Sequence, residues 1–255
     1  MNYYLNTALI LFFYMSAWFV ISLIKKRNDV ADIAWGLGFV IISWTSFFIS
    51  SEYSPRSIFV NLLVTIWGLR LAFHIYKRNR KKQEDYRYMQ WRNDWGRWFL
   101  LRSYLQVYLL QGFFLFMIVF SVVFINKSSI SAISFYDIFG FIVWLIGFFF
   151  EVVGDFQLAN FIKNPENKGR IMQTGLWKYT RHPNYFGEVA QWWGIFIIAL
   201  SLPYGFITII SPITITILIL FISGIPLLEK KMLENLEFIE YKKRTSVFIP
   251  LFPKK

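Results

Sequence analysis

The stretch "YYLNTALILFFYMSAWFVISLI", residues 3–24, is a run of 22 residues without a charged side chain. A helix of about 20 mostly apolar residues is long enough to cross the hydrocarbon core of a bilayer. The run is followed by "KKRN" at 25–28, with no small-residue cleavage site, so we expect it to be retained as an anchor. The stretch therefore predicts a fold built from membrane helices.

Similar runs recur along the chain, which is 56% hydrophobic and 21% aromatic, more than a soluble domain of this size carries. No hydrophilic stretch is long enough for a separate soluble core. We predict one all-α membrane domain over residues 1–255, a bundle of seven transmembrane helices followed by an amphipathic segment at 226–255. The spans are predicted at 3–24, 30–50, 57–76, 104–125, 136–155, 185–201 and 204–224.

Residue counts exclude several kinds of chemistry. The chain has no cysteine, which excludes disulfides, thiolate nucleophiles and thiolate metal sites. Its two histidines, His74 and His182, are too few for a histidine-rich metal site, so we expect no metal.

The distribution of basic residues predicts the topology. With the N-terminus outside, the cytoplasmic segments hold 24 of the 27 lysines and arginines. Cytoplasmic loops of membrane proteins carry such an excess, so we predict an outside N-terminus and a cytoplasmic C-terminus. The net charge of +12 is then explained by topology and by attraction to anionic membrane lipids, and we expect no nucleic-acid partner.

Polar side chains fall near the cytoplasmic ends of three predicted spans, at helical spacing within each. Ionisable residues are costly in hydrocarbon, so they line a cavity or pair with one another. An ion pair of Arg70 with Glu151 or Glu188 that only holds helices together is the competing interpretation. The set predicts a cytoplasm-facing cavity lined by Arg70, His74, Glu151, Asp155, Asn184, Glu188 and Gln191, with Trp192 beside them.

Two cytoplasmic segments flank this cavity. The segment at 76–103 mixes cations with aromatic residues, which is typical of an interfacial element, although its "EDYRY" core (84–88) could also reach a bound anion. The segment at 157–185 contains Asn-Pro, Lys-Gly, Thr-Gly and His-Pro breakers, which predict a structured loop. This loop leads into a helix N-terminus and carries cations, a combination that binds phosphate: Arg170, Lys178, Arg181 and His182.

The stretch "GDFQLANFIKNPENKGRIMQTGLWKYTRHPNYFGEVAQWWG", 154–194, together with "FIEYKKRTSVFIPLFPKK", 238–255, resembles the steroid 5-alpha-reductase-like group of membrane proteins, specifically its uncharacterised bacterial branch. Weaker similarities occur in "DIAWGLGF" (32–39), "WGLRLAFHIYKRNR" (67–80), "EDYRY" and "LQG" (110–112). The resemblance spans most of the chain. It implies a multi-pass protein of the bacterial inner membrane.

The resemblance also implies a seven-helix bundle that takes NADPH from the cytoplasm and transfers hydride to an electron-poor carbon–carbon double bond of a lipidic substrate, steroid-like or isoprenoid-like. By position, Asp155 matches an acidic cofactor contact and Arg170 a phosphate-binding arginine. Lys163 is a looser match to a basic residue, and Glu151 stands where an asparagine is expected. The remaining cofactor residues implied by the two stretches are Arg181, His182, Asn184, Tyr185, Glu188, Gln191, Trp192, Tyr241 and Arg244.

For the substrate, reductases of this type use a tyrosine and a carboxylate to hydrogen-bond the carbonyl, which stabilises the enolate formed by hydride transfer. His74 lies near the expected tyrosine, and Asp32 is the nearest carboxylate. A protonated His74 beside Arg70 would give the same electrophilic assistance. A helix-end histidine bonded to a neighbour is the alternative interpretation.

Two other functions stay open. The "RHPNYFGE" motif (181–188) and the C-terminal tail are also similar to isoprenylcysteine carboxyl methyltransferase and related enzymes, in which the same loop and helix bind S-adenosylmethionine. The cations around Arg170 favour the phosphates of NADPH over that cofactor. In a non-enzymatic alternative, the cavity holds a lipid headgroup. The sequence indicates neither the substrate nor an oligomeric state.

Overall fold

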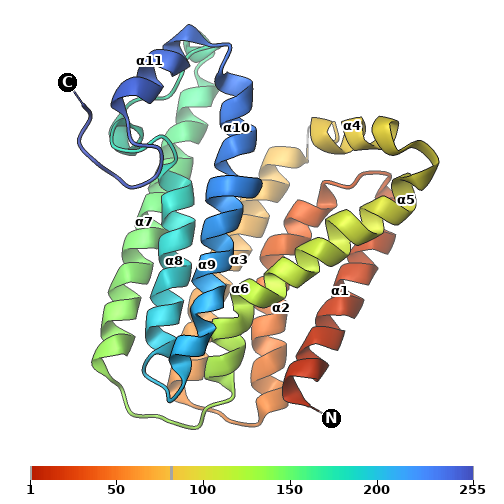
Figure 1. Cartoon of the computed structure of the whole chain (residues 1–255), viewed down its shortest axis with the longest axis vertical. Coiled ribbons are helices and arrows are strands. Elements are labelled where there is room, and N and C mark those ends of the chain that lie inside the picture. The colour runs from red at the N-terminus through yellow and green to blue at the C-terminus, as the bar shows by residue number, and fades with distance from the viewer. Residues whose placement is uncertain (1, 81–82, 255) are drawn as a thin grey trace. The chain divides into compact units, whose positions relative to one another are not determined.

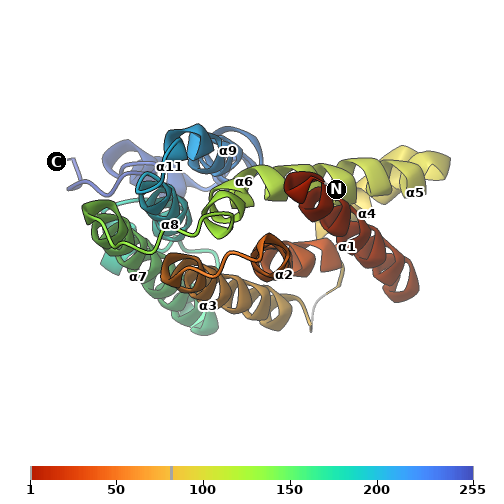
Figure 2. The same cartoon turned by 90° about the horizontal axis from the view of Figure 1, so that it is seen from below.

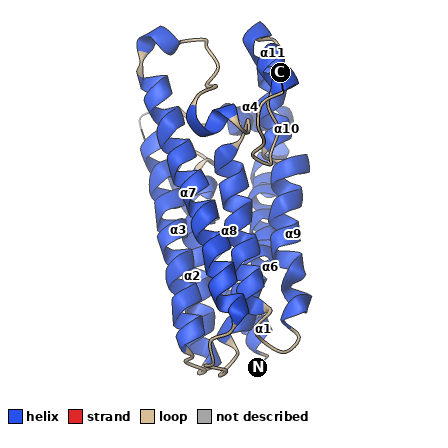
Figure 3. Cartoon of the chain, turned by 90° about the vertical axis from the view of Figure 1, so that its left-hand side faces the viewer, coloured by secondary structure: helices blue, strands red, loops and turns tan. Residues whose placement is uncertain are grey.

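The computed structural model describes residues 2–80 and 83–254. Within these residues every regular element is helical, apart from an isolated bridge between Thr180 and Ser246 (Figure 3). The predicted all-α fold is thus confirmed. The basic residues Lys81, Lys82 and Lys255, which contribute to the predicted charge asymmetry, lie outside the described residues.

The helices group into two compact units, residues 1–133 and 134–255, which are described one at a time below. A single membrane domain stays a prediction. The first unit contains α1 (Tyr3–Lys25), α2 (Val30–Ser50), α3 (Pro55–Asn79), α4 (Tyr86–Trp95), the 3₁₀ turn η1 (Gly96–Trp98), α5 (Phe99–Arg102), the π-helical segment η2 (Ser103–Leu109) and α6 (Leu110–Asn126).

Within the first unit, α2 and α3 run side by side (Figure 2). They approach closely because glycines meet at the crossing: a Cβ added to Gly68 would lie 2.7 Å from the Gly36 carbonyl oxygen. A buried amide joins them to α6, since Asn61 accepts a hydrogen bond from Ser43 and donates one to Asn126 at 2.7 Å. These polar groups are satisfied, so they fix helix register without an unpaired buried dipole.

The second unit is built on a pair of antiparallel helices, α7 and α8 (Figure 1). These two helices and the loop between them carry eleven of the thirteen predicted cofactor residues. The second unit contains α7 (Phe135–Lys163), η3 (Pro165–Asn167), η4 (Gly175–Lys178), α8 (Pro183–Ala199), η5 (Gly205–Ile209), α9 (Ile210–Ile217), the π-helical η6 (Leu218–Ile222), α10 (Ile225–Met232) and α11 (Leu236–Arg244).

Glycines let the backbones of α7 and α8 touch. A Cβ on Gly147 would lie 2.6 Å from the Gly187 carbonyl oxygen, and one on Gly194 would lie 2.6 Å from the Gly140 carbonyl oxygen. Small residues allow this approach in membrane helices, where packing rather than the hydrophobic effect holds helices together. The contact brings the polar side chains of the two helices within hydrogen-bonding distance of one another.

Six helical stretches of the described chain are long and apolar enough to cross a membrane, which supports an integral multi-pass protein. The six are α1, α2, α3, residues 87–126, α7 and residues 205–232. The seventh predicted span, 185–201, corresponds to α8, which has 17 residues and is not among them. Seven spans therefore stay a prediction.

Two predicted boundaries are wrong. The fifth span was expected to end at 155 with a loop from 157, but α7 continues to Lys163 because no helix breaker occurs before Asn164-Pro165. The amphipathic segment 226–255 was expected to form a surface helix before its "IPLFPKK" tail, residues 249–255. It forms two, α10 and α11, and Phe238 and Tyr241 on α11 are buried.

Candidate functional site

The loop between α7 and α8 is held to α7 by two side chains. The Trp177 indole donates to the Gly154 carbonyl at 3.1 Å, and Gln157 accepts a hydrogen bond from the backbone N–H of Leu176 at 2.9 Å. Gly175 adopts a left-handed φ of 62° at this point, and a Cβ there would collide with Gln157. The breaker-rich segment is therefore an ordered loop, as its sequence predicts.

A buried ion cluster fixes the end of this loop. The Arg181 guanidinium donates to Glu229 at 2.8 Å, and a ring nitrogen of His182 lies 3.1 Å from the same carboxylate oxygen. Arg181 also donates to the Thr245 carbonyl at 2.6 Å. Burying these charges is costly unless they are paired, which explains why α10 supplies an acid here.

Arg181 and His182 were expected to be among the cations with which this loop binds phosphate, but here they are buried against an acid. Their side chains are only 7% and 5% exposed and are turned towards Glu229. The sequence places Glu229 about 50 residues downstream, so spacing alone does not identify it as their partner. A contact of Arg181 or His182 with a cofactor stays a prediction.

The C-terminal helix α11 binds the same loop from another side. The Tyr241 hydroxyl donates to the Trp177 carbonyl, and Arg244 donates to Gln173 at 2.7 Å. Glu237 accepts from the Ile171 N–H at 3.0 Å. Burial raises the pKa of Tyr241, so its hydroxyl stays a neutral donor. The structure thus brings together the two stretches that carry the family resemblance.

The predicted polar residues of α7 and α8 meet in pairs. The Asn184 amide nitrogen donates to Asp155 at 3.1 Å, and the Gln191 amide nitrogen donates to Glu151 at 2.5 Å. The oxygen atoms of the same two amides are not hydrogen-bonded. Oδ1 of Asn184 and Oε1 of Gln191 are buried and have no hydrogen-bond partner among the described residues. A buried acceptor without a donor costs about 1–3 kcal/mol, so this surface favours a ligand that donates hydrogen bonds.

The other predicted cofactor residues surround these pairs at different depths. Trp192 is buried, Glu188 is half-buried, and the Tyr185 ring stacks on His182 with centroids 5.7 Å apart. Lys163 and Arg170 are exposed. Lys163 lies in the last turn of α7 and Arg170 lies in the loop, and exposed cations of this kind can bind a phosphate group.

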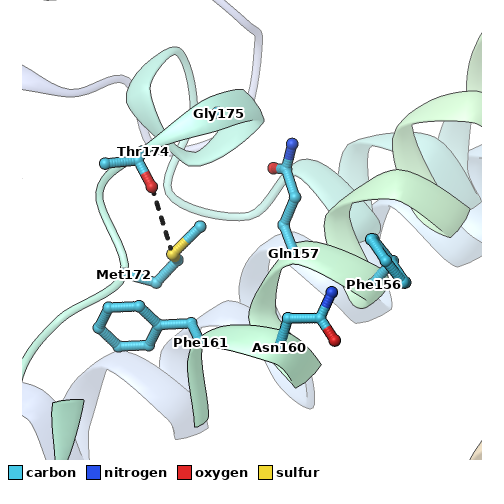
Figure 4. Close-up of a pocket in the computed structure, with 7 residues that line it drawn as sticks. All are labelled: Phe156, Gln157, Asn160, Phe161, Met172, Thr174 and Gly175. Atoms are coloured by element: carbon cyan, nitrogen blue, oxygen red, sulfur yellow. Dashed lines mark hydrogen bonds between the residues drawn. The ribbon is translucent and has the colours of Figure 1, made fainter. Parts of the chain in front are cut away.

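A cavity of about 310 Å³ lies nearby in the second unit, between the end of α7 and the loop (Figure 4). Asn160 and Gln157 reach it from α7, and Met172 and Thr174 reach it from the loop. None of the predicted cofactor residues is among its lining residues, which are Phe156, Gln157, Asn160, Phe161, Met172, Thr174 and Gly175. This cavity is therefore separate from the predicted cofactor residues.

A second polar cluster lies in the first unit and explains the "EDYRY" segment. The Tyr88 hydroxyl donates to Asp32 at 3.0 Å, and Arg87 lies 3.6 Å from the other oxygen of this carboxylate. Glu84 accepts from the backbone N–H of Asn28 at 2.6 Å. Asp85 caps α4; burial opposes its ionisation, but hydrogen bonds from Arg87 outweigh that effect and lower its pKa.

Tyr88 is the residue that sequence reasoning missed. Its segment was noticed as a family similarity, but spacing along the chain does not reveal that α4 folds back onto the start of α2. The predicted substrate residues Arg70 and His74 lie one turn apart on α3, both half-buried. They belong to the first unit, whereas the other five residues of the predicted cavity belong to the second, so that cavity stays a prediction.

Comparison with known proteins gives a family and partial relatives. The family described as "Protein of unknown function (DUF1295)" matches residues 18–245. The chain is 36% identical over 63 residues to 3-oxo-5-alpha-steroid 4-dehydrogenase 1 of Mus musculus and of Rattus norvegicus, and 40% identical over 55 residues to that of Bos taurus.

These stretches are 25% of this chain for the mouse and rat proteins and 22% for the bovine protein. The chain spans about a quarter of the length of the curated relatives it matches: 25% of the mouse protein, 24% of the rat protein and 21% of the bovine protein. No solved structure matches the chain.

Proposed function

This chain belongs to the DUF1295 family, and we propose that it is a membrane reductase that uses NADPH to reduce an activated carbon–carbon double bond of a lipidic substrate. The proposal rests on the partial similarity to 3-oxo-5-alpha-steroid 4-dehydrogenases together with the polar surface of α7 and α8. It includes the predicted seven spans, with the cofactor entering from the cytoplasm.

The observation that carries the cofactor assignment is the Asp155–Asn184 pair. Asn184 uses its amide nitrogen on Asp155 and keeps a buried oxygen without a partner. It also stands at the second position of α8, after Pro183, where backbone N–H groups lack helical partners. Both features fit a nucleotide, which has hydroxyl and amide donors as well as phosphates.

The residues proposed to hold NADPH have distinct roles. Asp155 and Asn184 bind its hydrogen-bonding groups, and the exposed cations Lys163 and Arg170 bind its phosphates. Glu151 is a buried partner of Gln191 and orients that side chain. Glu188, Tyr185 and Trp192 complete the proposed wall, while Tyr241 and Arg244 hold the loop in place.

NADPH supplies a hydride when bound, and polar side chains of the chain give electrophilic assistance to the substrate carbonyl. Tyr88 joins Asp32, Arg70 and His74 as a candidate for this role, since its hydroxyl already bonds Asp32. A hydroxyl has one proton to donate. Tyr88 therefore either turns from Asp32 to a substrate carbonyl, or Asp32 is protonated and donates to Tyr88 while Tyr88 donates to that carbonyl. Hydride addition at the β-carbon then gives an enolate, which takes a proton from water at the α-carbon.

The methyltransferase alternative keeps one supporting observation. Because Glu229 neutralises part of the charge of Arg181 and His182, these two residues contribute less to a phosphate site than the sequence predicts. S-adenosylmethionine carries no phosphate and does not need that charge. The two cofactors therefore have to be compared directly.

Ligand-dependent thermal unfolding of the purified protein in detergent makes this comparison. A ligand at a hundredfold excess over its Kd adds about 2.7 kcal/mol of stability. We expect NADPH to raise the midpoint by several degrees and S-adenosylmethionine to leave it unchanged. A shift with S-adenosylmethionine alone would overturn the reductase proposal, and no shift with either ligand would favour a lipid-binding protein.

A further inference from the structure

The segment Gly96–Arg102, here called the arginine turn, joins α4 to the helical run formed by η2 and α6. Gly96 has a left-handed φ of 46°, which ends α4 and lets the chain change direction before α5. Figure 1 shows α4 and α5 meeting at this bend, at the end of the first unit where α1 also ends. The turn lies in the N-terminal part of residues 87–126, a stretch that is long and apolar enough to include a membrane span.

Two arginines of the turn are exposed and lie over aromatic rings rather than beside acids. The Arg97 guanidinium carbon is 5.4 Å from the Trp98 ring centroid, and that of Arg102 is 6.0 Å from the Trp95 centroid. Within the described chain neither forms an ion pair with a carboxylate. Stacking on an aromatic face leaves the outer face of a guanidinium available to an anion.

The neighbouring arginines of α4 are different. Arg87 pairs with Asp85 at 3.0 Å, and Arg92 lies 3.2 Å from Glu84. Each of these two arginines thus has an acidic partner on the same segment. Only the two arginines of the turn present uncompensated positive charge on this segment.

Apolar side chains surround these two charges. Trp98, Leu100 and Leu101 are 52%, 54% and 50% exposed. Trp91 and Trp95, on the last turns of α4, stack with ring centroids 5.1 Å apart. Tryptophan and arginine next to exposed leucine match the level of a bilayer at which headgroup phosphates meet acyl chains. A soluble acidic partner would not account for the exposed leucines.

We propose that the arginine turn binds the phosphate headgroup of an anionic phospholipid, with Arg97 and Arg102 as the phosphate ligands. Trp98, Leu100 and Leu101 lie against the adjoining acyl chains. The inference stands apart from the reductase proposal, because none of these residues belongs to the proposed cofactor or substrate groups. A membrane rich in anionic lipid would then anchor the end of this helix.

Photoreactive phosphatidylglycerol and phosphatidylcholine, each with the reactive group near the glycerol, test the proposal on the detergent-purified full chain. Labelled peptides are mapped by mass spectrometry. We expect phosphatidylglycerol to label residues 95–102 far more than phosphatidylcholine does. At about 1 kcal/mol for each surface arginine, Arg97→Gln with Arg102→Gln should lower that labelling roughly thirtyfold.

The matched control is Arg92→Gln, the same substitution on the same segment at an arginine already paired with Glu84. This substitution should leave labelling of residues 95–102 within about twofold of that of the parent protein. Labelling elsewhere in the chain serves as an internal standard, which shows whether the double variant is misfolded. If it is misfolded, the comparison of the two lipids on the parent protein decides whether the turn prefers an anionic headgroup. Equal labelling by both lipids, an unaffected double variant, or competition by inorganic phosphate would overturn the assignment.

Discussion

At the scale of single residues, the "RHPNYFGE" motif divides into two parts with different partners. Arg181 and His182 face Glu229 inside the second unit, while Asn184 faces Asp155 on α7. The first part is an internal ion cluster and the second keeps a buried acceptor without a donor. The motif therefore combines a structural ion cluster with a candidate ligand contact at Asn184, two residues after His182.

The ligand contact is tested by Asn184→Ala. The substitution removes the amide that bonds Asp155, and a hydrogen bond to a charged group contributes about 1.5–3 kcal/mol. We expect NADPH affinity to fall by about tenfold or more, measured by ligand-dependent thermal unfolding. Asn160→Ala removes an exposed amide from α7 and is the control. If both variants respond to NADPH like the parent, the cofactor is elsewhere.

The buried ion cluster is tested by Glu229→Ala. Removing one partner of a buried ion cluster leaves Arg181 uncompensated, which costs about 3–5 kcal/mol. For a chain of this length we expect the unfolding midpoint to fall by on the order of 10 °C. Glu240→Ala is the control, because its pair with Lys243 is more than 60% exposed on both sides and contributes less than about 1 kcal/mol. Equal midpoints for the two variants would contradict the assignment.

At the scale of elements, the contact between α7 and α8 sets the geometry of the candidate site. Gly147 lies against Gln191 and Gly187 lies against Glu151, and the side chains of Gln191 and Glu151 form a hydrogen bond across this contact. A shift of one helix along the other would separate both polar pairs at once. The glycines thus contribute to the site without touching a ligand.

Gly147→Ala tests this contact. The added Cβ would lie 2.6 Å from a backbone oxygen and 2.7 Å from a backbone nitrogen of α8, so the helices must move apart. Overpacking of this kind costs about 1–3 kcal/mol, and we expect a lower unfolding midpoint together with a weaker NADPH response.

Gly112→Ala is the matched control for this substitution. Its Cβ would meet only the flexible Met15 side chain, at 3.0 Å. An alanine there also gains about 1 kcal/mol of helix propensity. A Gly147→Ala protein as stable as this control would show that the close approach is unimportant.

Hydrophobic patterning and local signals predict helices well in this chain, and contacts between distant elements poorly. The predicted spans at 3–24 and 30–50 agree with α1 and α2 to within one residue. The partner of Arg181, the Tyr88–Asp32 hydrogen bond and the glycine contacts were not predicted. Each joins residues far apart in the chain, and no local periodicity encodes such a pairing.

At the scale of the whole molecule, the basic residues predict the orientation in the membrane. Positive-inside topology puts 24 of 27 lysines and arginines in the cytoplasm. A reporter fused to the C-terminal end should therefore be active in the cytoplasm, and one inserted at 128–134, between α6 and α7, should be active outside. The reverse pattern would contradict the predicted orientation and the cytoplasmic entry of NADPH.

The central claim is that the chain reduces a lipidic double bond with hydride from NADPH. The most direct measurement incubates the purified protein with a membrane lipid extract and NADPH deuterated at C4, and then compares lipid masses. We expect one lipid class to gain one deuterium atom, transferred as deuteride, and one hydrogen atom, added as a proton. Asn184→Ala should weaken this gain when NADPH is not saturating. Tyr88→Phe should abolish the gain but keep the NADPH-dependent rise in the unfolding midpoint. A lipid that instead gains a methyl group from added S-adenosylmethionine, with no deuterium incorporated, would contradict the account.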